Sequence, residues 1–406
     1  MIYNAGIFLY YLLIQFASLF NARAKRWVAG RKGLFEKLAK NDFSGSKKIW
    51  FHASSLGEFE QGRPLIEEYR KKYPDYKIVV TFYSPSGYDL RKNYDKADVV
   101  TYLPFDFKSN AKKFIDLIKP DVAVFIKYEF WLNYLAELKK RGVKTYLVSG
   151  IFRKDQLFFK WYGGWYRKAL LKFDHFFVQN TESLEILKGA GFSNVTLTGD
   201  TRCDRVMQIV ATPVNYPVVE KFVAGSTVFI AGSAWETEGD FMAEYINKTD
   251  RKLKFIIAPH EINEAKIERL ISKIRKPVVR YSKTDENNVA DKEVLIIDNV
   301  GMLASLYRFG HVVLIGGGFN DGIHNILEPA AYGRPVIFGP KFRKFQEAYD
   351  LIKLGGGFAV KDYIEFENIV EKLLGKHEFL QSASDISRSY ISGSAGATWR
   401  TMEGME

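Results

Sequence analysis

A glycine cluster in the second half of this 406-residue chain is the feature best suited to chemistry. Gly316, Gly317 and Gly318 come directly after an apolar run at 311–315, which predicts a buried strand. Glycine lets backbone N–H groups approach an anion closely, and the N-terminus of a following helix adds partial positive charge. The cluster therefore predicts an anion-binding turn between a strand and a helix.

The polar residues after this cluster indicate which anion it binds. His324, Asn325 and Glu328 stand in the pattern His-Asn-x-x-Glu-Pro. A carboxylate at this place can bind the hydroxyls of a sugar, as acidic residues do in nucleotide-binding folds. The combination favours a nucleotide-sugar site. A simpler interpretation stays open, in which Asn325 only caps a tight strand–helix turn.

A second candidate site lies near the N-terminus. The run at 48–52 predicts a strand, and Ser55, Gly57 and Glu58 follow it at the start of a predicted helix. Open α/β sheets bind ligands at the carboxyl ends of their strands, where Glu58 could act as a general base. The alternative is a capping box, Ser55-x-x-Glu58, in which the glutamate only closes the helix.

Alternating patterns surround both candidates. In the first half, further apolar runs predict strands at 77–82, 99–103, 122–126, 145–148, 175–179 and 195–198. A second series follows a proline-bounded linker, at 228–230, 254–257, 278–281, 294–297, 312–315 and 335–338. Amphipathic segments lie between the runs. This alternation predicts an α/β protein with two doubly wound parallel sheets, and the length also favours two domains.

The first residues predict a membrane-associated segment. Residues 2–20 carry no charge and are about long enough to span a bilayer, and a basic cluster at 23–32 follows them. We expect residues 1–22 to form an anchor helix, with the rest of the chain on the cytoplasmic side because the positive charges come after the apolar run. A helix lying in the membrane interface and a helix buried in the fold are the alternatives.

The composition of the chain favours some classes of binding partner over others. The net charge of +12 favours acidic partners, and aromatic residues make up 15% of the chain. Residues 158–168 mix Trp, Tyr and Phe with Lys and Arg, which favours a membrane surface over nucleic acid. An ordinary helix with an aromatic core face would give the same pattern. The single Cys203 excludes an internal disulfide and a multi-cysteine zinc site.

Taken in order, the motifs resemble a known family. They are Ala-Ser-Ser-Leu-Gly-Glu-Phe at 53–59, Tyr-Glu-Phe-Trp at 128–131, Thr-Gly-Asp at 198–200, Ala-Gly-Ser at 231–233, and the glycine cluster with its His-Asn-x-x-Glu-Pro. This order resembles the 3-deoxy-D-manno-octulosonic acid (Kdo) transferases of lipopolysaccharide synthesis, over nearly the whole chain. The resemblance implies a GT-B glycosyltransferase, in which two Rossmann-like domains face a cleft. We expect these domains at 23–210 and 218–385, with residues 386–406 crossing back toward the first domain.

The resemblance also implies roles for individual residues. Glu58 would be the general base of an inverting transfer from CMP-Kdo to a lipid A precursor (lipid IVA). Donor binding would fall to Ser233, His260, Gly316, Gly317, Gly318, His324, Asn325 and Glu328. Acceptor binding or support would fall to Ser55, Gly57, Glu129, Arg153 and Arg202. The chain departs from the family's pattern at Lys127, where many members have glutamate, and at 259–261, where many have Pro-Arg-His.

No cofactor or metal is expected, because the chain has no Asp-x-Asp triplet of the kind that holds nucleotide phosphates through a metal in many sugar transferases. The family implies a place on the cytoplasmic face of the inner membrane, with CMP-Kdo and the lipid A precursor as partners. No nucleic-acid partner is expected, and the sequence makes no prediction of oligomeric state.

Other functions stay open at this point. A GT-B transferase could use a UDP-sugar on another lipid acceptor, and a nucleotide-sugar epimerase can share the GT-B fold. The apolar N-terminal segment counts against the epimerase, which has no need of it. A membrane scaffold without enzymatic activity would not explain Glu58 together with the glycine cluster.

Overall fold

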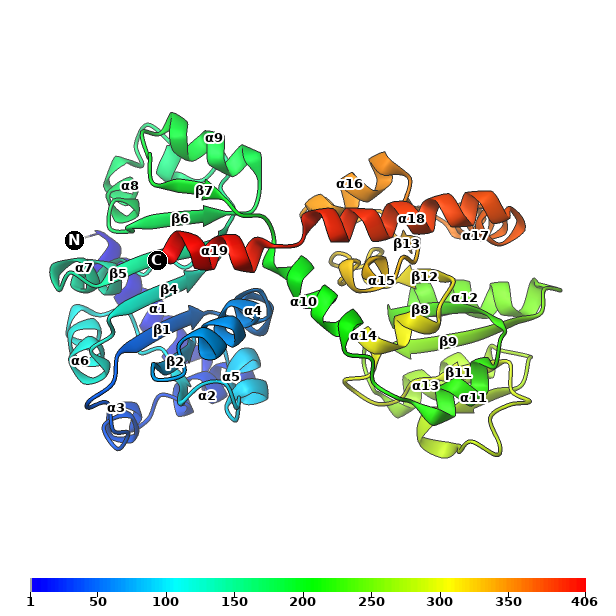
Figure 1. Cartoon of the computed structure of the whole chain (residues 1–406). Coiled ribbons are helices and arrows are strands. Elements are labelled where there is room, and N and C mark those ends of the chain that lie inside the picture. Colours follow the sequence, from blue (N-terminus) through cyan, green and yellow to red (C-terminus); the bar gives the residue numbers. More distant parts are fainter. Residues whose placement is uncertain (1) are drawn as a thin grey trace. The chain divides into compact units, whose positions relative to one another are not determined.

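The structure is a computed structural model that describes residues 2–406 and divides into two compact units. Unit 1 comprises the chain up to Arg205 together with Ala395–Glu406, and unit 2 is Val206–Ser394. Each unit is a parallel sheet covered by helices (Figure 1). The prediction of an α/β protein with two doubly wound parallel sheets is confirmed.

The chain passes from one unit to the other twice. It leaves unit 1 within α10 (Thr201–Ala211) and returns between α18 (His377–Ser394) and α19 (Ala397–Met405). Residues 386–394, which the sequence grouped with the returning segment, are thus part of unit 2. The return is fixed on unit 1 by Asp204, which accepts hydrogen bonds from the backbone N–H of Gly396 and of Thr398 at 2.5 and 2.6 Å.

The sheet of unit 1 has seven parallel strands in the order β3-β2-β1-β4-β5-β6-β7. The strands are β1 (Lys48–Ala53), β2 (Lys77–Phe82), β3 (Val99–Tyr102), β4 (Val122–Ile126), β5 (Lys144–Gly150), β6 (His175–Val178) and β7 (Val195–Leu197). All seven predicted runs are strands. They form because the runs are apolar, and β1, β2, β4 and β5 are largely buried on both faces, as a sheet between two helical layers requires.

The sheet of unit 2 also has seven parallel strands, in the order β10-β11-β9-β8-β12-β13-β14. The strands are β8 (Thr227–Ala234), β9 (Leu253–Pro259), β10 (Val278–Arg280), β11 (Val294–Ile296), β12 (Val312–Ile315), β13 (Val336–Phe338) and β14 (Gly357–Ala359). The sequence did not predict β14, because three residues that begin with glycine show no periodicity.

Helices connect the strands and cover both sheets. In unit 1 the further helices are α1 (Ile2–Ala17), α2 (Ala22–Ala29), α3 (Leu34–Leu38), α4 (Leu56–Lys72), α5 (Pro85–Arg91), α6 (Lys108–Ile118), α7 (Leu132–Lys140), α8 (Gly164–Leu170) and α9 (Thr181–Gly189). In unit 2 they are α11 (Pro217–Val223), α12 (Glu236–Lys248), α13 (Glu264–Ser272), α14 (Leu303–Leu306), α15 (Leu327–Ala331), α16 (Gln346–Leu354) and α17 (Tyr363–Gly375). Side-chain caps such as Asn180, Asn263 and Asp362 begin several of them.

Helix α1 lies against unit 1 and is not a separate element. Tyr3 donates a hydrogen bond to Asp106 at 2.5 Å, the Asn133 amide donates to Asn4 at 2.9 Å, and the ring of Tyr11 lies 4.9 Å from that of Phe105. None of its residues is fully buried, so it is not a core helix. Its apolar side chains are exposed on the outer face: Ile2, Phe8, Leu9, Leu12, Leu13 and Phe16.

The length of α1 bears on the anchor prediction. Its 16 residues give about 24 Å of helix, which is shorter than a hydrocarbon core of about 30 Å. Among residues 2–406, no single helix is long and apolar enough to cross a bilayer. The pair α1 and α2 reaches the required length and composition together, but the two helices are bent by 118° at their junction.

The aromatic and basic segment at 158–168 is not one continuous helix. A short 3-10 turn (Leu157–Phe159) precedes α8, and the aromatic side chains divide between inside and outside. Phe158 is buried and stacks on Tyr166, whereas Trp161 is 93% exposed and Tyr162 and Trp165 are also on the surface. The exposed side chains of Trp161, Tyr162 and Trp165 therefore form neither the buried aromatic face of an ordinary helix nor a continuous stripe along one helix.

Candidate functional site

The candidate residues of unit 1 gather at the carboxyl edge of its sheet. Successive strands are added on one side of β1 up to β3 and on its other side from β4 onward. The neighbouring strands β1 and β4 therefore form a topological switch point, where open α/β sheets bind ligands. Ser55 is the N-cap of α4, and Gly57 and Glu58 lie in its first turn. The sequence prediction therefore placed these three residues correctly at the end of β1.

The geometry of this turn bears on the capping-box alternative. Ser55 donates its hydroxyl to the Glu58 carboxylate, but it makes no side-chain bond to the helix backbone. A capping box needs bonds from both side chains to backbone N–H groups. Glu58 is half-buried, and its carboxylate accepts a hydrogen bond from the Ser55 hydroxyl instead of one from a backbone N–H group at the start of the helix. This arrangement is suited to a positioned base.

The loop after β4 holds a buried polar network that the sequence did not predict. His52 is fully buried on β1, and its Nδ1 lies 2.8 Å from the hydroxyl of Thr81. Its Nε2 lies 3.2 Å from the Glu129 carboxylate, which also accepts the indole N–H of Trp131 at 2.5 Å. Glu129 therefore serves to fix the loop after β4 on the end of β1. Lys127, the departure from the family's pattern, begins this loop in a left-handed conformation with φ of 69°.

The two predicted arginines lie in separate places on unit 1. Arg153, after β5, lies over the ring of Tyr128 at 5.7 Å, so the loops that follow β4 and β5 meet there. Arg202 lies in the first turn of α10, and its guanidinium contacts the Asp200 carboxylate at 2.6 Å. Cys203, the next residue, is buried.

In unit 2 the candidate residues surround the point where β8 and β12 pair. Ser233 lies at the carboxyl end of β8, and the glycine cluster follows β12. The backbone is close-packed here: a side chain on Gly318 would place its Cβ 2.5 Å from the backbone nitrogen of Gly339. Ser233 itself has φ of 51°, a left-handed conformation that non-glycine residues adopt at a cost. Both features keep backbone groups at the open end of the sheet.

A buried carboxylate that the sequence did not predict joins these two loops. Glu238 is fully buried on α12 and accepts hydrogen bonds from the backbone N–H of Gly317 at 2.8 Å and of Trp235 at 3.1 Å. Burial raises the pKa of Glu238, and these backbone bonds oppose the rise. The only sequence signal was the three-residue spacing from Trp235 to Glu238, which is that of a capping box on an unusual N-cap residue.

Three aromatic rings stack beside this junction. Trp235 lies 4.4 Å from His260, and His260 lies 4.5 Å from His324, with interplanar angles of 15° and 28°. The Trp235 indole N–H donates to Nε2 of His324 at 3.1 Å. Burial, and then the neighbouring His260, lower the pKa of His324 to about 4. The neutral His324 ring thus accepts at Nε2 and carries its proton at Nδ1.

A small hollow of about 60 Å³ adjoins the stack. Trp235 and His260 line it together with the side chains of Lys266 and Arg269 from α13. The stack provides a flat apolar surface that suits a base, whereas the two cations are paired with Glu261 and Glu236 in the same lining. The structure thereby groups His260, His324 and the glycine cluster, as the sequence predicted.

Asn325 and Glu328 bond to each other at the start of α15. The Asn325 amide donates to the Glu328 carboxylate at 3.0 Å, and its oxygen accepts the backbone N–H of Leu327 at 3.1 Å. Asn325 therefore does cap the turn, as the simpler interpretation proposed, and it also positions Glu328. Because α15 has only five residues, its helix dipole would contribute little to binding an anion here.

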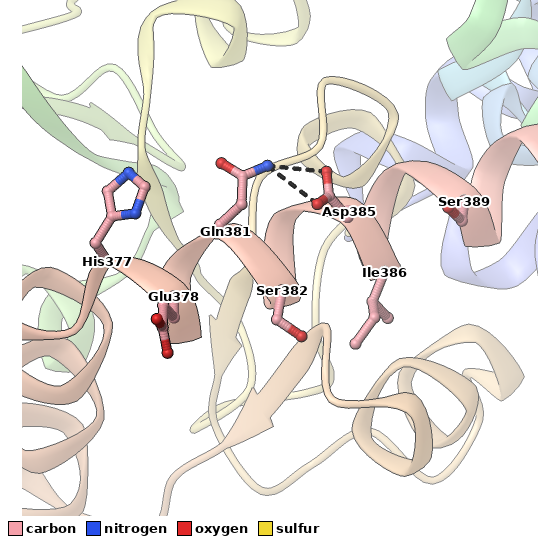
Figure 2. A pocket seen from close by; sticks show the side chains of 7 residues that line it. All are labelled: His377, Glu378, Gln381, Ser382, Asp385, Ile386 and Ser389. Atoms are coloured by element: carbon pink, nitrogen blue, oxygen red, sulfur yellow. Dashed lines mark hydrogen bonds between the residues drawn. The ribbon is translucent and has the colours of Figure 1, made fainter.

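A larger hollow elsewhere in unit 2 lacks these properties. Figure 2 shows that one helix, α18, supplies all of its lining side chains. Gln381 donates to both oxygens of Asp385 at 3.0 Å, so these two groups satisfy each other. No loop at the end of a strand contributes to the lining, which separates this hollow from the candidate site. The lining residues are His377, Glu378, Gln381, Ser382, Asp385, Ile386 and Ser389.

Comparison with known proteins shows which family this chain resembles. A family model described as 3-deoxy-D-manno-octulosonic-acid transferase (kdotransferase) matches residues 26–205. A 3-deoxy-D-manno-octulosonic acid transferase of Aquifex aeolicus is 28% identical over 354 residues, which cover 84% of this chain and 90% of the relative. One of Chlamydophila psittaci is 27% identical over 351 residues, covering 82% and 80%. The chain is thus similar to Kdo transferases over more than four fifths of its length.

Solved structures agree on the fold. A UDP-GlcNAc 2-epimerase from Neisseria meningitidis bound to UDP-GlcNAc superposes with a TM-score of 0.62, covering 88% of this chain and 99% of that one, at 16% identity. MurG from Acinetobacter baumannii gives a TM-score of 0.55 over 88% and 98%, at 10% identity. At such identities the likeness concerns the fold alone. The expected resemblance to Kdo transferases and the GT-B type of fold are confirmed.

Proposed function

We propose that this protein is a glycosyltransferase that moves Kdo from CMP-Kdo to a lipid A precursor, lipid IVA, in lipopolysaccharide biosynthesis. The observation that carries the proposal is the similarity to Kdo transferases along more than four fifths of the chain. The arrangement of polar groups at the open ends of the two sheets is compatible with it. The UDP-sugar transferase and the epimerase remain the alternatives that experiment has to separate.

Unit 2 would bind the donor. The Nδ1–H of His324 would stabilise the phosphate of CMP as it leaves, beside a glycine cluster whose Gly317 N–H is already bound to Glu238. The Trp235–His260 stack offers a face for the cytosine ring. Glu328, held by Asn325, would accept hydrogen bonds from the ribose.

Unit 1 would bind the acceptor and supply the base. The acceptor hydroxyl attacks the anomeric carbon of Kdo while the bond to CMP breaks, and Glu58 takes the hydroxyl proton. The sugar passes through an oxocarbenium-like state, and a single attack inverts the configuration. Ser55 orients the Glu58 carboxylate, and the Glu129 network holds the neighbouring loop in place.

Donor identity is tested by ligand-induced stabilisation. We expect CMP to raise the unfolding temperature of the purified protein, because a ligand that binds only the folded state stabilises it by RT ln(1 + [L]/Kd). UDP and CDP at the same concentration should raise it less. The control is Glu328→Ala, in which loss of a charge-assisted hydrogen bond worth about 1.5–3 kcal/mol should reduce the CMP effect. A larger shift with UDP would favour the UDP-sugar alternative.

Transfer should not require a divalent metal. We propose this because the chain has no Asp-x-Asp triplet. Initial rates measured with excess EDTA should equal those without it. A rate that falls with EDTA and returns with Mg²⁺ or Mn²⁺ would contradict this prediction.

The protein would work at the cytoplasmic face of the inner membrane, where a lipid acceptor is accessible. Helix α1 presents its apolar side chains outward along one unit. Burial and then the nearby Asp106 carboxylate raise the pKa of Tyr166, as they do for Tyr3, which places the segment 158–168 near the first turn of α1. Exposed Trp161 and Trp165 would add to the same membrane-facing surface.

This surface can be tested by substitution. Replacing Leu9, Leu13 and Phe16 together by glutamate should reduce binding to anionic vesicles at least ten-fold, because each exposed apolar side chain contributes about 1.5–3 kcal/mol when buried in lipid. Vesicle flotation measures the binding. Substitution is a sharper test than deletion of residues 1–22, which would also remove the Tyr3 bond to Asp106.

The matched control is Leu90→Glu, which changes an equally exposed leucine on α5 of unit 1. The control should bind vesicles as the unchanged protein does. If the triple variant floats as well as the control, α1 is not the membrane contact.

A further inference from the structure

We propose that a pocket beside α1 holds an acyl chain of the glycolipid acceptor. The pocket has a volume of about 500 Å³, within the usual range of roughly 300–1,000 Å³ for small-ligand sites. Its walls come from α1, α2, the turn into α3, and the loop between β3 and α6. Six of the lining residues carry the argument: Tyr11, Trp27, Val28, Phe35, Phe105 and Phe107.

The lining is suited to a hydrocarbon chain. Rings from three separate segments pack edge to face, with Tyr11 4.9 Å from Phe105 and 5.6 Å from Phe107, and Trp27 4.5 Å from Phe105. Such rings form a fixed apolar wall, and apolar surface removed from water on both sides favours binding. Val28 and Phe35 are half-buried and complete the apolar lining.

One polar atom in this wall lacks a partner. Trp27 is only 7% exposed, and its buried indole N–H has no hydrogen-bond acceptor in the structure. A buried donor without a partner is costly, by roughly 1–3 kcal/mol. Because this N–H is itself buried, it does not face the pocket, and the proposal rests on the apolar lining.

The surroundings of the pocket point to a lipid that comes from a membrane. Helix α1 supplies one wall with Tyr11 and exposes Leu12, Leu13 and Phe16 on its other side. Lys32 lines the pocket and is exposed, so a cation lies where a phosphorylated headgroup would be. A chain could therefore enter from the same surface that we propose to contact the bilayer.

The link to the candidate base favours the acceptor over bulk phospholipid. Arg31, in the pocket wall, donates to the backbone oxygen of Tyr83 at 2.7 Å, in the loop after β2. The next residue, Ser84, donates its N–H to the oxygen of Ser54 at 2.7 Å, and Ser54 precedes the turn that carries Glu58. One lipid could thus place a chain in the pocket and its sugar at Glu58. This inference rests on the proposed function.

The test fills the pocket and measures selectivity. We would compare kcat/KM for lipid IVA with kcat/KM for its O-deacylated form, at saturating CMP-Kdo. In Val28→Trp this ratio should fall at least ten-fold, because the added ring occupies the space of the chain. The control is Leu13→Trp, which adds the same ring to the exposed face of α1 and should keep the ratio within two-fold. An unchanged ratio in V28W would overturn the proposal.

A labelling experiment keeps this test separate from the proposed activity. Lipid IVA with a diazirine near the end of an acyl chain should label Tyr11, Phe105 or Phe107, and V28W should reduce that labelling at least five-fold. If the protein transfers no Kdo, the proposed function fails while this readout still decides the pocket. Label confined to the outer face of α1 would overturn the inference.

A competition measurement and a replacement variant complete the labelling experiment. Excess phosphatidylethanolamine should compete poorly with the labelled lipid IVA, and equal competition would assign the pocket to bilayer lipid and overturn the acceptor assignment. Should V28W fail to fold, Gln15→Trp fills the same pocket from α1 and takes its place in both measurements.

Discussion

Replacing Glu58 by glutamine should lower turnover by roughly 10²–10⁴-fold, the usual contribution of a general base. Glutamine has nearly the same shape and can still accept the hydroxyl of Ser55, but it cannot take a proton. Binding of CMP and the unfolding temperature should therefore hardly change. Steady-state kinetics with CMP-Kdo and lipid IVA, beside a thermal unfolding curve, would measure both.

The control for this variant is Glu68→Gln, which makes the same change further along α4, at a side chain that is paired with Lys71 on the surface. It should leave turnover within two-fold of the unchanged protein. If E58Q keeps near-normal turnover, Glu58 only completes the start of α4 and another group is the base.

Replacing Gly318 by alanine should abolish measurable CMP binding, or weaken it at least 30-fold. The new Cβ would lie 2.5 Å from the nitrogen and 2.6 Å from the Cα of Gly339, both of them backbone atoms that cannot move independently. The loop after β12 must then shift away from the end of β13, and its N–H groups lose their positions. Isothermal titration with CMP would measure the loss.

Gly393→Ala is the matched control, because a Cβ there would meet nothing within 4 Å and Gly393 lies in α18 of the same unit. Alanine in a helix interior is favoured by roughly 0.5–1 kcal/mol, so this variant should bind CMP normally and be slightly more stable. Normal CMP affinity in G318A would show that the glycine cluster is a packing feature without a role in binding.

Particular residues show what the sequence could predict of the site. Gly316–Gly318, Ser55 and Glu58 were found because local chemistry marks them: glycine where backbones approach, and polar residues directly after an apolar strand. Glu238 and His52 were not found. Their function depends on contacts with residues 79 and 77 positions away in sequence, and a single buried carboxylate or imidazole has no local pattern.

The sequence by itself determined the two parallel sheets, because burial on both faces demands continuous apolar runs and the runs can be counted. It also predicted the resemblance to Kdo transferases, through the order of its motifs. Only the tertiary structure decided that α1 lies on unit 1, that Trp235, His260 and His324 stack, and that Glu238 joins two loops. These features arise where strands distant in sequence become neighbours, since strand order and not local propensity fixes which loops meet.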